Sequence, residues 1–421
     1  MNVNDSEVMA GLLSSHGYKL VDSINDAQIV IVNTCGVKLP TEHRVLSYLS
    51  KLNKLTDKKI IVAGCLPKMT LEKIKRAIPN YSAIIGPNGI YDIVDIVRRI
   101  TTSSNEKIIL LDSPLNENRL LLPTYRFSKV SAIVPISQGC LGACTYCSVK
   151  FARGNLRSFP LQHIVHQVDS LVSTGYKEIW ITSEDVGVYG ADIGLTIVDL
   201  LNKLIELDGN FRLRVGMMNP ASILHFYDEL AEVFKDAHIY KFLHLPVQSG
   251  SDKILSLMRR FYTVQDFIDI VNTFRKKNPR ITISTDIIVG FPGETDEDFA
   301  LTLDLIENIK PDLVNISKYG DRPNTVASKM PNHVPSKIIK MRSRILTKKV
   351  LEISYNINKT WIGWSGDVLF SEVGDRGEMI GRNYTYKPIV LREFDGQNIF
   401  GEIKKIKIVD NGANYLVGVL E

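Results

Sequence analysis

Three cysteines lie within eight residues of one another, in the pattern Cys140-Leu-Gly-Ala-Cys144-Thr-Tyr-Cys147. They follow a run that is expected to form a buried strand, 131–136, and a short turn. Thiolates are soft ligands that suit zinc or an iron–sulfur cluster. Three of them can hold one face of a [4Fe–4S] cube, whereas structural zinc normally takes four protein ligands. No further Cys lies within 70 residues and the nearest His is His163, so the spacing favours iron–sulfur over zinc.

Composition adds few limits to those set by the cysteines. The chain has 421 residues, and its 51 Lys and Arg against 46 Asp and Glu give a net charge of +5, which is compatible with nucleic acid without indicating it. Five cysteines are an odd number and too few for a disulfide scaffold, which indicates a reducing compartment. The polar start is unlike a signal peptide, and no apolar run approaches the ~20 residues of a membrane span. We therefore expect a cytoplasmic protein with no membrane segment.

The hydrophobic pattern divides the chain into three parts. In the first, about 1–115, β-branched runs alternate with helical patterns, which is typical of a parallel α/β domain. A stretch at about 104–128, with Pro114 and Pro123 inside it, is expected to be a linker. The expected strands are 29–32, 60–63 and 84–85, and the expected helices are 5–16, 41–54, 70–77 and 91–100.

The second part, 129–345, repeats a strand followed by a helix six times. Six such units predict an open (βα)6 barrel of the TIM type, in which the chemistry lies at the carboxyl ends of the strands. The expected strands are 131–136, 178–183, 211–215, 241–246, 281–288 and 313–318, and the clearest helices are 161–174, 194–207 and 264–277.

The third part, 358–421, has short alternating runs and many glycines, which predict a small all-β domain. Its expected strands are 367–370, 388–391, 404–409 and 415–420. It carries eight Lys and Arg against nine Asp and Glu, so it is not a broad basic surface. A basic helix at 337–349 precedes it, with six Lys and Arg and no acid. That helix could contact phosphates, and a solvated helix face explains it equally well.

The other two cysteines occupy equivalent places in the first part. Cys35 follows the strand at 29–32, and Cys65 follows the strand at 60–63. Ligands of open α/β sheets gather at the carboxyl ends of the strands, so the two thiols could converge on one site. Two small core residues are the alternative.

The CxxxCxxC loop resembles that of the radical S-adenosylmethionine (SAM) superfamily, and Tyr146, just before the third cysteine, fits the same pattern. The resemblance implies that Cys140, Cys144 and Cys147 hold a [4Fe–4S] cluster whose open iron chelates SAM, which is cleaved to a 5′-deoxyadenosyl radical. It also implies that polar residues after the second barrel strand contact the SAM amino group. A turn or a helix N-cap is the alternative for these residues, which are Ser183, Glu184 and Asp185.

Two later strand ends carry polar groups that are expected to face the same cavity. Gln248 follows the fourth strand, and Asp286 belongs to the fifth, before Gly290 and Gly293. Glycine at such a place lets a ligand approach the backbone. Gln248 and Asp286 are therefore further candidates for cofactor binding. We assign no catalytic residue beyond the cluster ligands.

Along essentially its whole length the chain resembles the methylthiotransferase family of radical SAM enzymes. The matching stretches are VNTCGVK, VAGCLPK, GCLGACTYCSVKFARGNLRS, ITSEDVGVYG, LHLPVQSGSDKILSLMRR and STDIIVGFPGETDEDF. The resemblance implies an N-terminal α/β domain with a second, auxiliary [4Fe–4S] cluster, a radical SAM barrel and a C-terminal RNA-binding β-barrel called TRAM.

The same resemblance implies three cysteine ligands for the auxiliary cluster. Cys35 and Cys65 match the second and third of them, and the first has no match. Met1 is expected to fall just after the missing cysteine. A start codon placed too late is the explanation we favour, and a truncated chain or an incomplete cluster are the alternatives. As written, the chain would then bind the auxiliary cluster weakly and leave one position of its sheet unpaired.

The stretches ITSEDVGVYG and LHLPVQSGSDKILSLMRR resemble most closely the archaeal and eukaryotic enzymes that act on threonylcarbamoyladenosine in tRNA. The implied reaction uses SAM twice, once to methylate a sulfur on the auxiliary cluster and once to remove the hydrogen from carbon 2 of the adenine beside the anticodon. It also implies tRNA as partner, a reductant such as ferredoxin or flavodoxin, and a monomer. The alternatives are isopentenyl-adenosine in tRNA, a ribosomal protein, or RNA binding by a zinc protein without catalysis.

Several basic and aromatic residues are candidates for contact with substrate or RNA. Arg153 follows the cluster loop, with a salt bridge on the barrel surface as its alternative, and Lys340 and Arg344 belong to the basic helix. In the third part, Tyr384, Tyr386 and Lys387 could stack on bases or contact phosphates. Core packing is the safer interpretation for any one of them.

Overall fold

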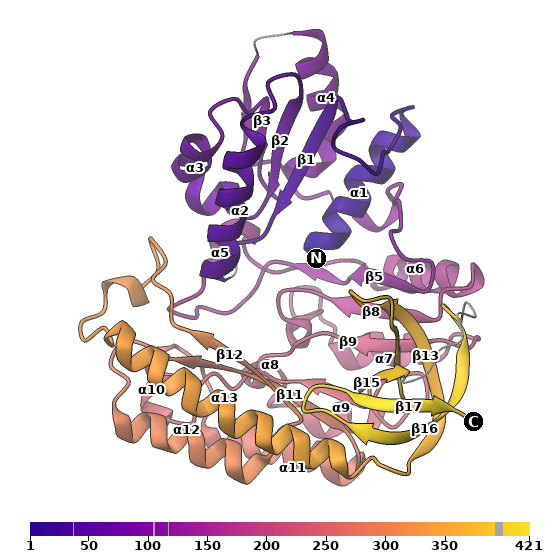
Figure 1. Ribbon diagram of the computed structural model, residues 1–421, viewed down its shortest axis with the longest axis vertical. Coiled ribbons are helices and arrows are strands. Elements are labelled where there is room, and N and C mark those ends of the chain that lie inside the picture. The colour runs from indigo at the N-terminus through magenta and orange to yellow at the C-terminus, as the bar shows by residue number, and fades with distance from the viewer. Residues whose placement is uncertain (37, 104–105, 117, 392–398) are drawn as a thin grey trace.

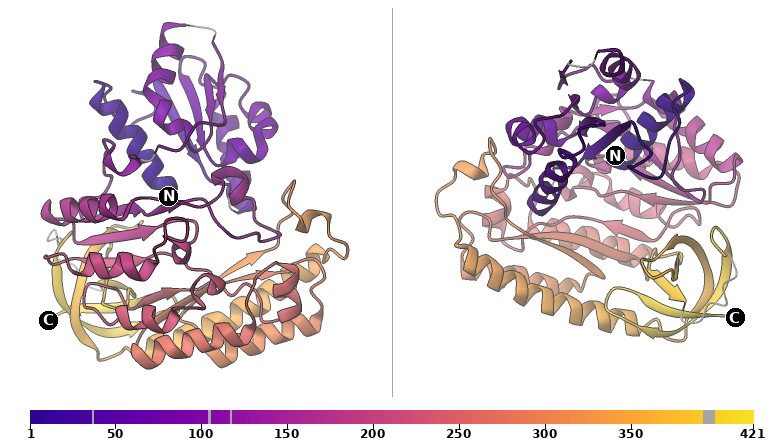
Figure 2. Two further views of the ribbon diagram at one scale, coloured as in Figure 1. Left: turned by 180° about the vertical axis from the view of Figure 1, so that it is seen from behind. Right: turned by 45° about the horizontal axis from the view of Figure 1, so that its top comes forward.

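The computed structural model describes residues 1–36, 38–103, 106–116, 118–391 and 399–421. Figure 1 shows three parts: an N-terminal α/β unit, a curved parallel sheet covered by helices, and a small β-barrel at the C-terminus. This order is the fold class that the sequence predicts. The first helix, α1 (Asn2–Ser15), begins close to the first strand of the curved sheet, β5 (Ser131–Pro135), where the two larger parts meet (Figure 2).

The N-terminal sheet contains four parallel strands in the order β1-β2-β3-β4. Alternate residues of β2 face opposite layers: Ile60 and Val62 pack with α2 and α3, whereas Ile61 and Ala63 pack with α1 and α4. The strands are β1 (Ile29–Thr34), β2 (Lys59–Gly64), β3 (Ala83–Ile85) and β4 (Ile108–Leu110), and the helices are α1, α2 (Leu39–Leu52), α3 (Leu66–Ala77), η1 (Gly89–Asp92) and α4 (Ile93–Thr102).

The expectation that 104–128 is only a linker is wrong at its start. Residues 108–110 pair with β3 as the fourth strand of the sheet. Three apolar residues are too short a run to show a strand period, so only the neighbouring strand reveals them. Leu120, in the turn η2 (Arg119–Leu121), packs against the core of the curved sheet. Positions 104, 105 and 117 of this segment lie outside the described residues.

The curved sheet holds the six parallel strands that the sequence predicts. Each strand begins and ends within two residues of its expected bounds. They form two sheets, β5-β8-β9 and β10-β11-β12, joined by a parallel bridge between Leu213 and Ile239. The strands after β5 are β8 (Glu178–Thr182), β9 (Arg212–Val215), β10 (Phe242–His244), β11 (Thr282–Val289) and β12 (Leu313–Lys318). Their carboxyl ends face the N-terminal unit, because the loop after β5 carries Cys140 and contacts that unit.

Helices cover the outside of this sheet, and threonine capping boxes fix the starts of three of them. Thr263 with Asp266 caps α11, and Thr295 with Asp298 caps α12 in the same way. The helices and short elements are β6 (Ser137–Gln138), α5 (Val149–Arg153), β7 (Arg157–Ser158), α6 (Leu161–Ser173), η3 (Val186–Val188), α7 (Ile197–Ile205), α8 (Pro220–Ile223), α9 (Tyr227–Val233), α10 (Asp252–Leu257), α11 (Val264–Lys277), α12 (Asp296–Ile309) and η4 (Ala327–Lys329).

The predicted basic helix is the first half of a long helix, α13 (Ser336–Lys359), which runs under the sheet to the C-terminal barrel (Figure 1). It packs on β12 and α12 through Ile339, Leu346 and Val350. Arg342 belongs to this packed face and is buried, so one of the six Lys and Arg of the basic stretch is not available for contact with phosphates.

The C-terminal part is a closed barrel in the order β13-β14-β15-β17-β16. Its core is built around Trp361 and Phe370. The sequence predicts four of the strands and misses β14, whose run contains Gly381. The strands are β13 (Ser365–Val373), β14 (Met379–Arg382), β15 (Pro388–Leu391), β16 (Ile403–Asn411) and β17 (Leu416–Leu420). Among the residues that the structure describes, no helix has both the length and the apolar character needed to cross a membrane.

The ion pair that Arg342 makes predicts a measurable contribution to stability. Its guanidinium contacts Glu294 Oε1 at 2.6 Å, and Glu294 is itself buried in the turn after β11. Arg342→Ala leaves that carboxylate buried without its cation, which should cost roughly 3 kcal/mol in the free energy of unfolding. Urea unfolding measures this. Arg344→Ala, on the exposed face of the same helix, is the matched control and should change it by less than ~0.5 kcal/mol. Equal unfolding midpoints for the two variants would contradict the role of the pair.

Candidate metal centre

The cysteine loop begins directly after β6 and ends at the short helix α5. Gly139 has a φ of +82°, and a Cβ there would lie 2.1 Å from the carbonyl oxygen of Asn155, so only glycine fits. The Cys140 amide donates to the Gly154 carbonyl at 3.3 Å, and the Cys147 amide donates to the Cys144 carbonyl at 3.1 Å. The loop is therefore closed at its base and tightly turned at its end.

The sulfur atoms of Cys140 and Cys144 gather around Gly142. A Cβ on that glycine would lie 3.2 Å from one Sγ and 3.8 Å from the other, and the Gly142 amide donates to Cys140 Sγ at 3.1 Å. Arg260 directs Nη1 at Cys144 Sγ, 3.6 Å away. Burial raises the pKa of Cys140 to about 12, so its thiolate needs a compensating positive charge. Backbone amides and a guanidinium around sulfur suit an iron–sulfur cluster, whose ligand thiolates accept such hydrogen bonds.

The far side of the loop is attached to the helix α10. Thr145 donates from Oγ1 to the Leu257 carbonyl at 2.9 Å and from its amide to the Met258 carbonyl at 3.1 Å. The Tyr146 ring packs edge-on against Phe291, with 6.3 Å between ring centroids. Tyr146 is therefore part of the packing that shapes the loop. Within the described ranges, no three His, Cys, Asp or Glu side chains are arranged to hold a single metal ion.

The three candidates after β8 have different surroundings. Glu184 accepts the Gly139 amide at 2.9 Å and lies 3.7 Å from Arg153, so it touches the base of the cysteine loop. Asp185 is buried and accepts from the amides of Gly187 and Asn219 and from the hydroxyl of Ser222. The hydroxyl of Ser183 accepts the Asp185 amide at 3.1 Å. Asp185 is thus engaged as the N-cap of η3, and Glu184 is the member of this group that reaches the metal loop.

Gln248 lies after the end of β10, beside Asp286 of β11. The Gln248 amide donates to the Asp286 carbonyl at 2.8 Å, and Gln248 has a φ of +73°. The Asp286 carboxylate accepts from Asn315 at 2.7 Å and contacts His244 at 3.4 Å. Burial alone would raise the pKa of Asp286, but these hydrogen bonds outweigh it and hold the pKa below its usual value. Asp286 is therefore a carboxylate in the second half of β11.

Cys35 and Cys65 follow neighbouring strands, as the sequence predicts. Thr34 pairs with Gly64 in the parallel ladder of β1 and β2, and the Cys65 amide donates to the Thr34 carbonyl at 3.0 Å. Cys65 is buried and Cys35 is half-buried. The two thiols therefore lie at one edge of the N-terminal sheet, beside the barrel.

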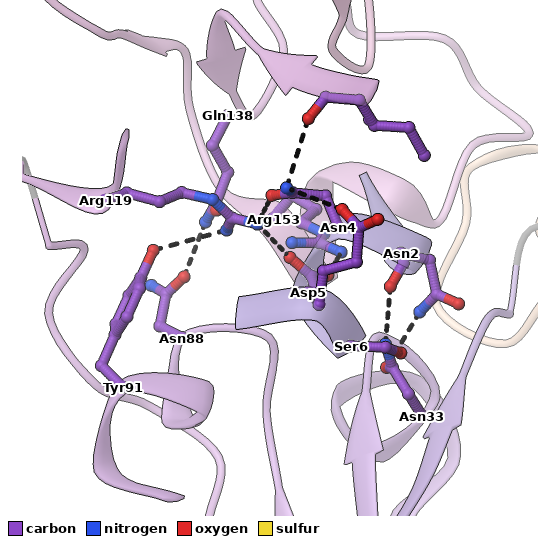
Figure 3. Close-up of polar contacts among 12 residues, drawn as sticks. Asn2, Asn4, Asp5, Ser6, Asn33, Asn88, Tyr91, Arg119, Gln138 and Arg153 are labelled. Carbon is purple, nitrogen blue, oxygen red and sulfur yellow. Dashed lines mark hydrogen bonds and ion pairs between the residues drawn. The ribbon is translucent and has the colours of Figure 1, made fainter. Parts of the chain in front are cut away.

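Arg153 connects the two groups of cysteines. It ends α5, six positions after Cys147, and its Nε donates to Cys65 Sγ at 3.1 Å across the boundary between the two units. Its Nη2 pairs with Asp5, whose other oxygen accepts from Arg119 at 2.6 Å (Figure 3). The structure thus places Arg153 in a buried network and not on the barrel surface.

The remaining candidates lie on α13 and on the C-terminal barrel. Lys340 and Arg344 are exposed on α13, which packs against β12 and α12. Tyr384 is exposed on the C-terminal barrel. Tyr386 packs against Tyr240 and Phe242, and Lys387 is buried between Asp312 and Asn358, so core packing accounts for both.

Comparison with known proteins identifies the family. Residues 134–306 match the radical SAM superfamily, and residues 1–86 match the uncharacterized protein family UPF0004. The chain is 42% identical over 421 residues to a probable threonylcarbamoyladenosine tRNA methylthiotransferase of Pyrococcus horikoshii, covering 99% of this chain and 96% of the relative. The chain belongs to this methylthiotransferase family. The human threonylcarbamoyladenosine tRNA methylthiotransferase is 36% identical, over 99% of this chain and 72% of the human protein.

Solved structures agree on the fold. The radical SAM methyltransferase TsrM from Kitasatospora setae has a TM-score of 0.59 at 15% identity, over 77% of this chain and 73% of TsrM. The cobalamin-dependent radical SAM enzyme OxsB has a TM-score of 0.54 at 14% identity, over 85% of this chain and 53% of OxsB. These likenesses concern the fold alone. Membership of the radical SAM superfamily implies one [4Fe–4S] cluster and SAM as cofactors of the family's chemistry.

Sequence reasoning misses three residues that shape this centre. Arg260 contacts Cys144, and Asp5 and Arg119 form the buried network with Arg153. Asp5 lies in a polar helical start and Arg119 in an irregular segment, so nothing local marks either as buried. Arg260 stands next to a second arginine in a run that ends a helix. What distinguishes these three residues is that their charged groups are buried. The sequence carries no signal of that burial, which is seen only in the tertiary structure.

The buried Asp5 carboxylate predicts a pH-dependent stability. Burial opposes its ionisation, but the guanidinium groups of Arg153 and Arg119 outweigh it and hold the pKa of Asp5 below its usual range. The stabilisation is therefore complete above the unfolded pKa of about 4 and is lost as the pH falls through the lower folded value. Asp5→Asn should lower the free energy of unfolding by roughly 3–5 kcal/mol at pH 7. The difference in the free energy of unfolding between Asp5→Asn and the unmodified protein should stay constant down to about pH 5 and become smaller below pH 4.

Urea unfolding at several pH values checks this expectation. Asp95→Asn, in an exposed pair with Arg98, is the matched control and should shift the free energy of unfolding by less than ~0.5 kcal/mol. The free energies of unfolding of Asp5→Asn and the unmodified protein could instead move further apart as the pH falls. That result would contradict a lowered pKa of Asp5 in the folded protein.

Proposed function

We propose that the protein is a tRNA methylthiotransferase that converts N6-threonylcarbamoyladenosine next to the anticodon to its 2-methylthio derivative by radical SAM chemistry. The observation that carries this proposal is the 42% identity to an enzyme of that name over 99% of the chain. Relatives named for the same substrate include archaeal, human and mouse proteins, which disfavours isopentenyl-adenosine and a ribosomal protein as the substrate.

In this proposal Cys140, Cys144 and Cys147 would hold the [4Fe–4S] cluster that binds SAM. With SAM bound, that cluster would supply the electron that releases a radical able to remove hydrogen from carbon, which the reaction requires because carbon 2 of adenine has no acidic proton. The protein's own contribution is to hold the loop, through Arg260 and Glu184, and to exclude water at the boundary of the two units. The adenine must leave its stack to reach this buried edge.

We also propose that Cys35 and Cys65 ligate the auxiliary cluster. Their strands end side by side. Burial raises the pKa of Cys65, and Arg153, whose Nε lies 3.1 Å from Cys65 Sγ, partly offsets this with its positive charge. The sulfur-donating site would then lie next to the SAM site, with α5 between them. The family pattern expects a third cysteine beside these two.

The remaining parts of the proposal concern organisation and partners. The divisions are 1–115 for the methylthiotransferase unit, 129–345 for the radical SAM barrel and 358–421 for the TRAM unit. Lys340 and Arg344 are exposed cations suited to phosphate contact. In this proposal Tyr146, Ser183, Gln248 and Asp286 would contact SAM. The protein is a cytoplasmic monomer that takes electrons from a ferredoxin or a flavodoxin.

The substrate assignment predicts a change in tRNA nucleosides. Deletion of the gene should remove the methylthio-threonylcarbamoyl nucleoside and leave the threonylcarbamoyl nucleoside in its place, as measured by mass spectrometry of digested tRNA. The unmodified gene should restore the product, and a gene with Cys140→Ser should not. Unchanged nucleosides after deletion would overturn the proposed function.

The cluster assignments predict distinct iron contents after anaerobic reconstitution. Cys35→Ser with Cys65→Ser should remove about four irons from the content of the unmodified protein and keep those at the loop. Cys140→Ser, Cys144→Ser and Cys147→Ser together should remove the loop's cluster and abolish SAM binding. If the double variant binds as much iron as the unmodified protein, Cys35 and Cys65 hold no cluster.

A further inference from the structure

A cavity of about 250 Å³ lies where the C-terminal β-barrel meets the amino ends of the strands of the radical SAM barrel. Lys177 and Arg212 line it from the starts of β8 and β9, whereas Trp364, Arg382 and Tyr384 line it from the C-terminal barrel. The cysteine loop follows the opposite, carboxyl end of these parallel strands. The cavity is therefore a separate site from the metal centre.

The wall of this cavity is positively charged. Three cations line it, Lys177, Arg212 and Arg382, against a single carboxylate, that of Asp367. Arg382 pairs with Glu372, which does not line the cavity. Within the described ranges neither Lys177 nor Arg212 forms an ion pair: their charged groups donate to the carbonyls of Gly401 and Phe211. Two cations held by neutral acceptors retain their capacity for an anion, and a phosphate is the anion that Arg binds well.

An aromatic surface adjoins these cations. Tyr384 is 38% exposed, and its ring lies 6.2 Å from that of Trp364 and 6.1 Å from that of Trp361. The two tryptophan rings pack against the tyrosine ring, which limits its movement. An exposed aromatic ring beside cations is the combination on which bases of single-stranded RNA stack.

We propose that this cavity binds one unpaired nucleotide of the tRNA, with its phosphate at Lys177, Arg212 and Arg382 and its base on Tyr384. The inference rests on the proposed function and adds a second contact to RNA, at the end of the barrel opposite the chemistry. The volume of about 250 Å³ is below the ~300–1,000 Å³ of ordinary ligand pockets, so it suits one nucleotide and not a duplex. Asp367 offers an acceptor for a ribose hydroxyl, which distinguishes RNA from other polyanions.

The site needs both units, because Lys177 and Arg212 come from the radical SAM barrel, whereas Arg382 and the aromatic surface come from the C-terminal domain. The two are attached at this place: the Lys241 amide donates to the Tyr384 carbonyl at 2.8 Å, and Lys177 reaches Gly401 at 2.7 Å. A tRNA held here is therefore held to the barrel itself. The expected consequence of losing the site is weaker binding with little change in the chemical step.

The test uses the full-length reconstituted protein and tRNA from cells that lack the gene, labelled for fluorescence anisotropy. Tyr384→Ala should weaken binding about 5- to 150-fold, whereas Tyr384→Phe, which keeps the ring, should bind like the unmodified protein. Arg212→Gln should weaken binding and reduce the slope of log Kd against log salt by about one. Both Tyr384→Ala and Arg212→Gln should raise the KM for tRNA and lower the kcat at saturating tRNA less than twofold.

Two variants on the same barrel, away from the cavity, serve as matched controls: Tyr415→Ala, a ring of similar exposure, and Arg376→Gln. Iron content and unfolding midpoint verify that each variant is folded.

If the unmodified protein modifies tRNA and the cavity variants bind it as tightly as the controls do, the inference is overturned and the proposed function stands. A free nucleotide site is the outcome if adenosine 5′-monophosphate binding, and not tRNA binding, depends on Arg212, and this too overturns the inference. If the unmodified protein does not modify tRNA, the proposed function fails and the inference falls with it.

Discussion

The position of Arg153 in a buried network is the constraint on which the rest of this structure depends. Its side chain and that of Asp5 are 1% and 0% exposed, and Arg119 completes the group. Buried charges are costly unless they are paired, so the N-terminal unit has one orientation on the barrel in which all of them find partners. Because Arg153 also contacts Cys65 and lies near Glu184, that same orientation determines where the two groups of cysteines lie.

This arrangement separates the protein into two working ends. At the carboxyl ends of the barrel strands, the cysteine loop, Glu184 and the edge of the N-terminal sheet form a buried, charged boundary that suits reactive chemistry away from water. At the amino ends, cations and aromatic rings surround an open cavity between the barrel and the C-terminal domain. The proposed nucleotide site would let a large RNA contact one end while it is modified at the other.

The main elements follow from local patterns. The CxxxCxxC spacing indicates the metal loop, the six β-branched runs indicate the barrel, and the equivalent places of Cys35 and Cys65 indicate neighbouring strand ends. Elements that lack a period of their own are missed: β4 is three residues long, and β14 contains a glycine. The sequence also does not distinguish the cations of the basic stretch of α13 from one another. Arg342 turns inward to Glu294, whereas Arg344 remains exposed.

The sequence by itself therefore determined the chemistry class and the family, because thiol spacing and long matching stretches are properties of the chain alone. It also determined the order of strands and helices, since hydrophobic period and capping residues act over a few positions. Only the tertiary structure decided which charges are buried together, which of Tyr384, Tyr386 and Lys387 faces outward, and that Arg153 reaches Cys65. Those relations join residues far apart in the chain, such as Asp5 and Arg153, which are 148 positions apart, and depend on desolvation that no local pattern records.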